Sequence, residues 1–232
     1  MRVYPAYLNP LEAGQASLHS DEAKHLIRVL RVKPNAELRV FDGLGNEAKA
    51  IVRSIDKYSL SIEVFEVYKS KTEAKLNISL AISLLKADKL ADIVRKSTEL
   101  GVKEIKLFYS QYSQLQKISE NKLQRLNKIA LEAAKQSARA VVPKIYAPVA
   151  LKDIDFGQIN LLAHPYAKDS LADIEINKES ITVFIGPEGG FSKEELAHFK
   201  QNMQLINLGP RILRVETAAI AVISGLLIPN AI

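Results

Sequence analysis

The sequence predicts two domains: a small β-rich domain over residues 1–70 and an α/β domain with a largely parallel sheet over residues 74–232. Two observations predict this. Up to about residue 70, short alternating apolar segments are separated by turn residues, as in antiparallel sheets. From Leu76 onward, strand-like and helix-like apolar patterns take turns, as in a parallel sheet with crossover helices. At 232 residues the chain can bury two cores.

One helix interrupts the strands of the first domain. Ser20 is expected as its N-cap, and Asp21 and Glu22 place two acids in its first turn. Residues 42–46 read as a hairpin loop. The pattern therefore indicates a small barrel-like module, followed by a polar linker at residues 69–73. The expected strands are 37–41, 47–55 and 60–67.

The second domain alternates between buried strands and amphipathic helices. Apolar residues recur at helical spacing over 90–100, where Gly101 ends the helix, and over 123–137. The apolar run 218–228 is too short to span a bilayer and indicates a buried helix. The expected strands are 76–84, 105–107, 159–163, 181–185 and 205–208.

Composition and charge limit the class of protein. The chain has no cysteine, which excludes disulfides, thiolate catalysis and cysteine metal sites. Because the N-terminus has no apolar signal core, we expect a cytoplasmic protein without a membrane segment. The net charge of +6 is uneven: residues 1–70 carry +1, residues 71–142 carry +7 and the remainder carries −2. The middle segment therefore suits a polyanion, although a solvated lysine-rich face is an equal alternative.

Two glycine-containing turns follow apolar strands and lead into helices. They are Gly186-Pro-Glu-Gly-Gly-Phe-Ser192 and Leu208-Gly-Pro-Arg-Ile-Leu-Arg-Val-Glu-Thr-Ala218. Turns at neighbouring strand ends would form a ligand crevice. The first turn lacks the Lys-Ser/Thr of a nucleotide P-loop and the spacing of a dinucleotide fingerprint. A tight connection with a capping box at Ser192 and Glu195 is the purely structural alternative.

The second turn carries two arginines between an apolar strand and an apolar helix. Guanidinium groups are rarely set against a core without a partner. Glu216 could be that partner in a structural ion pair. Alternatively, Arg211 and Arg214 bind a phosphate or a carboxylate, which their forked geometry suits.

Together these turns resemble the RsmE family, ribosomal RNA methyltransferases of the SPOUT class that methylate N3 of a uridine in small-subunit RNA. Further segments are similar to family motifs, so the resemblance spans nearly the whole chain. It implies a trefoil-knotted α/β domain, a PUA-like RNA-binding first domain, S-adenosylmethionine as cofactor, and 16S ribosomal RNA of the small subunit as partner. It also implies a homodimer with the active site near the subunit interface. The further segments are 25–31, 96–102, 132–139 and 162–165.

The resemblance also implies roles for individual residues. Uridine N3 carries a proton at neutral pH, so a base is needed, and Glu188 and Glu216 are candidate carboxylates. Arg139, Arg211 or Arg214 could stabilise the developing oxyanion. Arg214, with Glu216, is expected near the acceptor, and Arg139 is expected near the RNA. No metal site is expected. The cofactor contacts implied are Leu162, His164, Gly186, Glu188, Gly190, Leu208, Gly209, Ile212, Leu213, Thr217 and Ala218. The RNA contacts expected are Arg2, Arg28, Arg31, Lys33, Lys86, Lys89, Lys96 and Arg139.

Three positions depart from the family pattern, and two other functions stay open. Val215 replaces a threonine, Gln111-Tyr112-Ser113 lacks an expected arginine, and Ala140-Val141 replaces a polar pair.

A related SPOUT enzyme that methylates ribose 2′-hydroxyls is one alternative function, although its last motif differs from residues 213–217. A non-catalytic RNA-binding or ribosome-assembly factor with the same fold is the other.

Overall fold

The structure is a computed structural model that describes residues 3–176, 179–200 and 202–230. The chain folds as two compact units. Unit 1 contains the chain up to Glu73 together with Ala134–Val142, and unit 2 contains Ala74–Ala133 and the chain from Pro143 onward. The backbone therefore passes between the units three times. No helix in the described ranges is long and apolar enough to cross a membrane.

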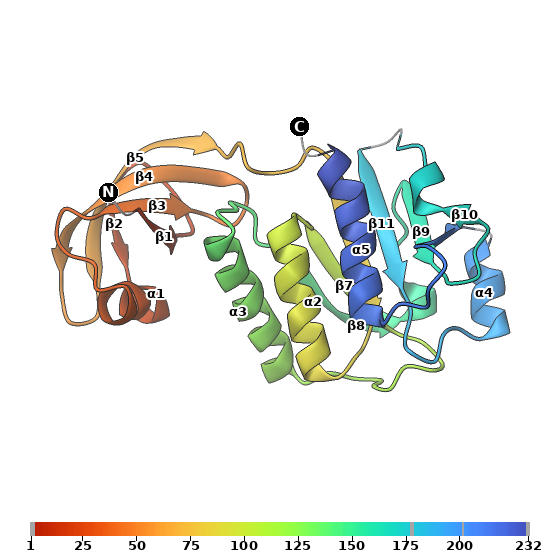
Figure 1. The fold of residues 1–232 in the computed structure, drawn as a ribbon. Helices are drawn as coiled ribbons and strands as arrows, with labels where there is room; N and C mark the ends of the chain where they lie inside the picture. Colours follow the sequence, from red (N-terminus) through yellow and green to blue (C-terminus); the bar gives the residue numbers. More distant parts are fainter. Residues whose placement is uncertain (1–2, 177–178, 201, 231–232) are drawn as a thin grey trace. The chain divides into compact units, whose positions relative to one another are not determined.

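Unit 1 is built on a five-stranded sheet in the order β1-β3-β4-β5-β2 (Figure 1). β1 pairs in parallel with β3, and the other neighbours are antiparallel. All five strands and the helix contribute side chains to one hydrophobic core. Among the described residues no ladder joins β1 to β2, so strand hydrogen bonds do not close the expected barrel-like module. The strands are β1 Tyr4–Tyr7, β2 Gly14–Leu18, β3 Glu37–Phe41, β4 Asn46–Ile55 and β5 Leu60–Lys69.

The helix of unit 1 changes its winding halfway. The α-helix α1, Ser20–Lys24, continues as a π-helix, His25–Val29, in which the Leu30 N–H donates to the His25 carbonyl at 3.1 Å. The expected N-cap was wrong. His19 caps the helix without a side-chain bond, and Ser20 is the first helical residue.

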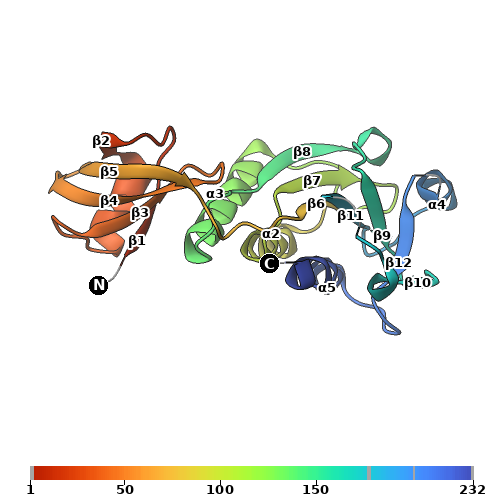
Figure 2. The same ribbon diagram turned by 90° about the horizontal axis from the view of Figure 1, so that it is seen from above.

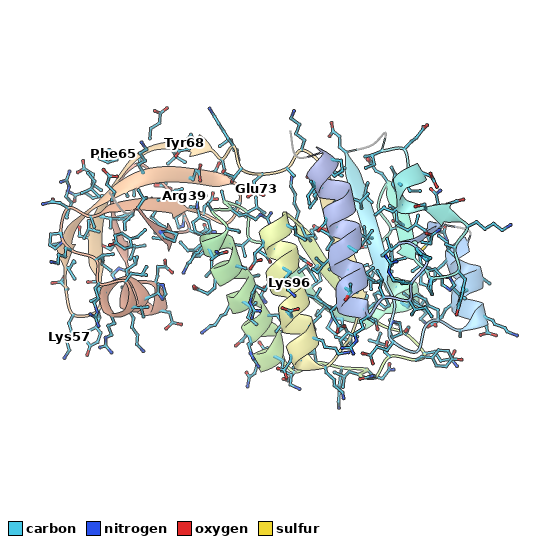
Figure 3. The ribbon with its side chains drawn as sticks, viewed as in Figure 1. Arg39, Lys57, Phe65, Tyr68, Glu73 and Lys96 are labelled. Atoms are coloured by element: carbon cyan, nitrogen blue, oxygen red, sulfur yellow. The ribbon has the colours of Figure 1, made fainter. Side chains whose placement is uncertain are left out.

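The segment 134–142 is held in unit 1 by two ion pairs of low exposure. Lys135 Nζ lies 2.6 Å from Glu22 Oε2, and Arg139 Nη2 lies 2.8 Å from Glu73 Oε2. Glu73 (Figure 3) also accepts the N–H groups of the two residues after Arg139, each at 3.0 Å. Lys135 is 7% exposed and Arg139 is 3% exposed, so their carboxylate partners are needed to offset the loss of solvent.

Unit 2 contains a seven-stranded sheet in the order β10-β12-β9-β11-β6-β7-β8. Every neighbouring pair in this sheet is parallel, which confirms the predicted parallel α/β architecture. The strands are β6 Asn77–Ser83, β7 Glu104–Tyr109, β8 Lys144–Ala150, β9 Ile159–Ala163, β10 Asp169–Ser170, β11 Ser180–Ile185 and β12 Gln204–Asn207.

Helices cover both faces of this sheet. α2, Ala87–Leu100, and α5, Val215–Leu227, lie side by side on one face (Figures 1 and 2). On the other face Phe199 of α4, Lys193–Lys200, packs against Phe184 of β11. As predicted, Gly101 ends α2 with a left-handed φ of 116°. The other long helix is α3, Glu120–Gln136.

Strand order corrects one expectation about the site. The two glycine-containing turns follow β11 and β12, but these strands are not neighbours, because β9 lies between them. The chain leaving β9 is therefore placed between the two turns. It becomes the third segment of any crevice at this edge of the sheet.

Candidate active site

A cavity of about 470 Å³ lies where β9, β11 and β12 end. Its walls come from three segments, 163–166, 185–191 and 208–213, and from the first turn of α5 at Val215 and Ala218. A volume of this size is typical of small-molecule sites. Because parallel strands point their carboxyl ends to one edge, three loops converge there.

Glycine is required at specific points of these turns. A Cβ on Gly186 would lie 2.5 Å from the Phe191 ring, so the ring occupies the space that a side chain would need. Gly190 and Gly209 have φ of 73° and 100°, which other residues rarely adopt. The turn also leads into the predicted capping box: the Ser192 N–H donates to Glu195 Oε2 at 2.9 Å, and the Glu195 N–H to Ser192 Oγ at 3.2 Å.

Asn207, the last residue of β12, ties two cavity segments together. Its side-chain amide donates to the carbonyls of Ala167 and Asp169 at 3.2 and 3.0 Å, and its carbonyl accepts the Gly209 N–H at 3.1 Å. The His164 N–H also donates to the Ile206 carbonyl at 2.9 Å. The sequence motifs did not single out Asn207, although an Asn before a glycine turn is a known signal for such bonds.

Most of the residues expected to contact a cofactor line this cavity. Two do not: Leu162 of β9 is fully buried in a hydrophobic core cluster, and Thr217 is exposed on α5 outside the lining. The expected residues in the lining are His164, Gly186, Glu188, Gly190, Leu208, Gly209, Ile212, Leu213 and Ala218.

A lysine joins two of the three expected catalytic residues. Lys89, in the first turns of α2, pairs with Glu188 of the first glycine turn, and its Nζ lies 3.7 Å from Glu216 Oε2 on α5. The Lys89 hydrogen bond holds the pKa of Glu188 below its usual value and raises the pKa of the lysine itself. Gln114 Nε2 donates to the second Glu188 oxygen at 2.6 Å.

Glu216 and Arg214 stand at the start of α5 beside the cavity. Glu216 Oε2 is buried and accepts no hydrogen bond from the residues described, and its side chain is 22% exposed. Arg214 is the N-cap residue of α5 and is exposed, as is Arg211. Neither arginine is therefore set against the core. Glu216 pairs with Lys89 rather than with an arginine.

The loop after β7 supports the first glycine turn. A Cβ on Gly189 would lie 3.0 Å from the Tyr112 Cβ, so this glycine lets the loop approach closely. The Gln111 N–H donates to Glu195 Oε1 at 2.9 Å. Residues 111–113, which lack the arginine expected from the family pattern, thus belong to a segment that contacts the site.

The residues expected to hold RNA differ in exposure. Arg139 is buried against Glu73, so its guanidinium stabilises unit 1 instead of facing solvent. Lys89 is engaged with carboxylates, and Lys96 pairs with Asp92 at 2.8 Å on the exposed side of α2 (Figure 3). Arg2 lies outside the described residues. The remaining four are exposed: Arg28, Arg31, Lys33 and Lys86.

Comparison with known proteins gives the family. The profile of an RNA methyltransferase domain matches residues 72–227, and that of an RNA methyltransferase PUA domain matches residues 18–65. Ribosomal RNA small subunit methyltransferase E of Rickettsia conorii is 34% identical, over 97% of this chain and 95% of its own length. The chain belongs to the ribosomal RNA small subunit methyltransferase E family.

Further relatives are similar in sequence or in structure. The Bacillus subtilis protein is 30% identical over 93% of this chain and 90% of its own. A Neisseria gonorrhoeae methyltransferase E, solved bound to S-adenosyl methionine, has a TM-score of 0.90 at 30% identity, covering 97% of each chain. A Legionella pneumophila putative methyltransferase, solved with the cofactor SAM, has a TM-score of 0.87 at 28% identity, covering 97% of this chain and 96% of its own.

Proposed function

We propose that this protein is an S-adenosylmethionine-dependent methyltransferase that methylates N3 of a uridine in 16S ribosomal RNA of the small subunit. Family membership supports the reaction class and the cofactor. One observation carries the assignment of the site. The cavity at the ends of β9, β11 and β12 has the carboxylates of Glu188 and Glu216 and the exposed Arg214 at its edge.

The cavity fits the cofactor by size and by the chemistry of its walls. Backbone groups of the two glycine turns can read the polar edge of an adenine, and Leu208, Ile212 and Leu213 offer apolar surface. When bound, S-adenosylmethionine supplies a methyl group carried on a sulfonium. The Glu188 carboxylate, kept charged by Lys89, adds negative charge to the lining.

Glu216 is the proposed proton acceptor. Its Oε2 accepts no hydrogen bond within the described chain and lies 3.7 Å from Lys89 Nζ. A carboxylate in this state can take the proton from uridine N3. Arg214, two residues earlier, can stabilise the negative charge that then develops on the uracil oxygens. Lys89 positions both carboxylates.

The remaining parts of the proposal concern assembly and location. Tyr166 and Ile212 at the cavity are 79% and 76% exposed, and such apolar surface favours a homodimer that covers it. β12 follows β11 along the chain, but in the sheet β9 lies between them. This strand order supports the proposed trefoil knot. Residues 1–70 form the proposed RNA-binding domain, and the substrate implies the cytoplasm.

Label transfer tests this function. The protein is incubated with methyl-labelled S-adenosylmethionine and unmodified small ribosomal subunits, and the RNA is digested to nucleosides. Label that coelutes with N3-methyluridine is the expected result. Label in a 2′-O-methylated nucleoside would favour the related ribose enzyme. Calorimetry that detects no S-adenosylmethionine binding at millimolar concentration would favour a non-catalytic factor.

A further inference from the structure

A second concave site lies in unit 1. It is a hollow of about 580 Å³ between the α1–π-helix segment and the turn that joins β4 to β5. We name it the α1 hollow. Its principal lining residues are Asp21, Lys24, Ile27, Arg28, Lys57 and Tyr58.

The α1 hollow carries excess positive charge. Three cations and one carboxylate line it. Lys24 and Arg28 are four positions apart, both are exposed, and neither forms an ion pair with any described residue. Charges that the protein leaves unneutralised in a concave site concentrate the field and attract anions. The hollow therefore favours a ligand with phosphate groups.

An exposed aromatic ring stands at the same hollow. Tyr58 is 65% exposed, and Lys57 Nζ lies 5.2 Å from the centroid of its ring. Figure 3 labels Lys57 at the turn before β5. A positively charged groove with an accessible ring is the combination that holds single-stranded nucleic acid, because bases stack on the ring while cations contact the backbone.

Both walls of the hollow are fixed by the fold. Ala23 and Leu26 have no exposed surface and anchor the helical wall to the core. The opposite turn is closed by the Asp56 N–H, which donates to the Ser59 carbonyl at 2.9 Å. Arg28 belongs to the π-helical stretch, a winding that occurs often at functional sites. The site is therefore formed before any ligand binds.

We infer that the α1 hollow binds one nucleotide of a single-stranded stretch of the RNA substrate. The base stacks on Tyr58, and the adjoining phosphates contact Lys24 and Arg28. This inference rests on the proposed function, which supplies the RNA. The carboxylates of an acidic peptide would pair with the cations, but they would not stack on the Tyr58 ring. RNA has both phosphates for the cations and a base for the ring, so RNA is the ligand that we favour.

Binding of a fluorescent short oligouridylate to the full chain, measured by anisotropy over a salt series, tests this. The Lys24→Gln/Arg28→Gln variant should flatten the slope of log K against log salt by about 1.4, from two lost contacts to a single strand. Tyr58→Ala should weaken binding about fivefold to a hundredfold, and Tyr58→Phe should keep it. Lys49→Gln/Lys69→Gln removes the same number of positive charges, and Tyr68→Ala removes the same ring, from exposed positions outside the hollow; both serve as controls.

Equal affinity and slope for the hollow variants and their controls would overturn the inference. Loss in Tyr58→Phe equal to that in Tyr58→Ala would also overturn it, because stacking needs only the ring. Methyl transfer by the wild-type protein is measured separately. If the wild-type protein transfers methyl groups normally but the hollow variants bind RNA as their controls do, the proposed function stands and the inference fails. If no protein transfers methyl groups, the proposed function is refuted, and the anisotropy measurement still decides whether the hollow binds RNA.

Discussion

The ammonium group of Lys89 on α2 pairs with the carboxylate of Glu188 in the turn after β11. The same lysine lies 3.7 Å from Glu216 on α5, so one cation joins three elements beside the cavity. In Lys89→Met the pKa of Glu188 should rise toward its usual value, since the largest cause of its depression is removed. Carboxyl NMR titration of both proteins measures this, and an unchanged Glu188 pKa would contradict the pairing.

The same pair makes a small contribution to stability that depends on pH. Because the folded-state pKa of Glu188 is lowered, its stabilisation is present above the usual pKa of a glutamate and is lost as pH falls through the lowered value. Lys89→Met should lack this loss of stability at acid pH. Both side chains are more than a third exposed, so solvent screening keeps the effect modest. Denaturant unfolding from neutral to acid pH would show it, and parallel curves for the two proteins would contradict it.

Arg214→Ala should lower methyl transfer about a hundredfold to a thousandfold, as expected for removal of a group that stabilises developing negative charge. Cofactor binding should be unchanged, because the neighbouring Leu213 and Val215 line the cavity and Arg214 does not. Single-turnover transfer and calorimetry separate the two. Full activity in Arg214→Ala would remove the arginine from the proposed mechanism.

Glu216→Gln should abolish most transfer at neutral pH while keeping the shape of the side chain. Its residual rate should rise with pH, because hydroxide deprotonates the uridine in place of the carboxylate. The pH dependence of the single-turnover rate measures this. A variant with the wild-type rate and pH profile would exclude Glu216 as the base.

Gly186→Ala should destabilise the fold by about 1–3 kcal/mol, the usual cost of overpacking. The new methyl group would meet the Phe191 ring, which Phe199 holds at 4.9 Å between centroids. S-adenosylmethionine binding should weaken as well, since both residues line the cavity. Gly186→Ala/Phe191→Leu, which shortens the obstructing ring, should recover part of the stability in thermal unfolding. No recovery would mean that the clash lies elsewhere.

Glu73→Gln should lower the free energy of unfolding by about 3 kcal/mol, because it leaves the buried Arg139 without its carboxylate. RNA affinity of the folded variant should stay unchanged. Chemical denaturation and anisotropy measure the two effects. An Arg139→Lys variant that folds normally but loses RNA affinity would instead support the RNA-binding role expected from the sequence.

Sequence patterns predict the buried parts of this fold well. β9 and β11 are short apolar runs with little exposed surface, so pattern alone locates them. β8 has alternating, partly exposed residues and contains Pro148, so nothing marks it as a strand. Strand order is a tertiary property, and the position of β9 between β11 and β12 could not be predicted from local pattern.

The same limit applies to the site. The glycine turns identify most of the cavity because they need specific backbone conformations there. Charge patterning places Lys89 among RNA-binding lysines, whereas the structure pairs it with Glu188, 99 positions along the chain. The burial of Arg139 is also hidden from the sequence, for a similar reason. Its partner Glu73 lies 66 positions away, and no local signal reveals that the ion pair is buried.

Mass mapping of 16S ribosomal RNA is the sharpest test of the proposal that this protein methylates the base of one uridine with Glu216 as proton acceptor. Small subunits lacking the modification are incubated with S-adenosylmethionine and either the wild-type protein or Glu216→Gln, and RNA fragments are analysed by tandem mass spectrometry. We expect one added methyl group on the base of a single uridine with the wild-type protein, and almost none with the variant. A methyl group on a ribose, or no methylated fragment, would contradict it.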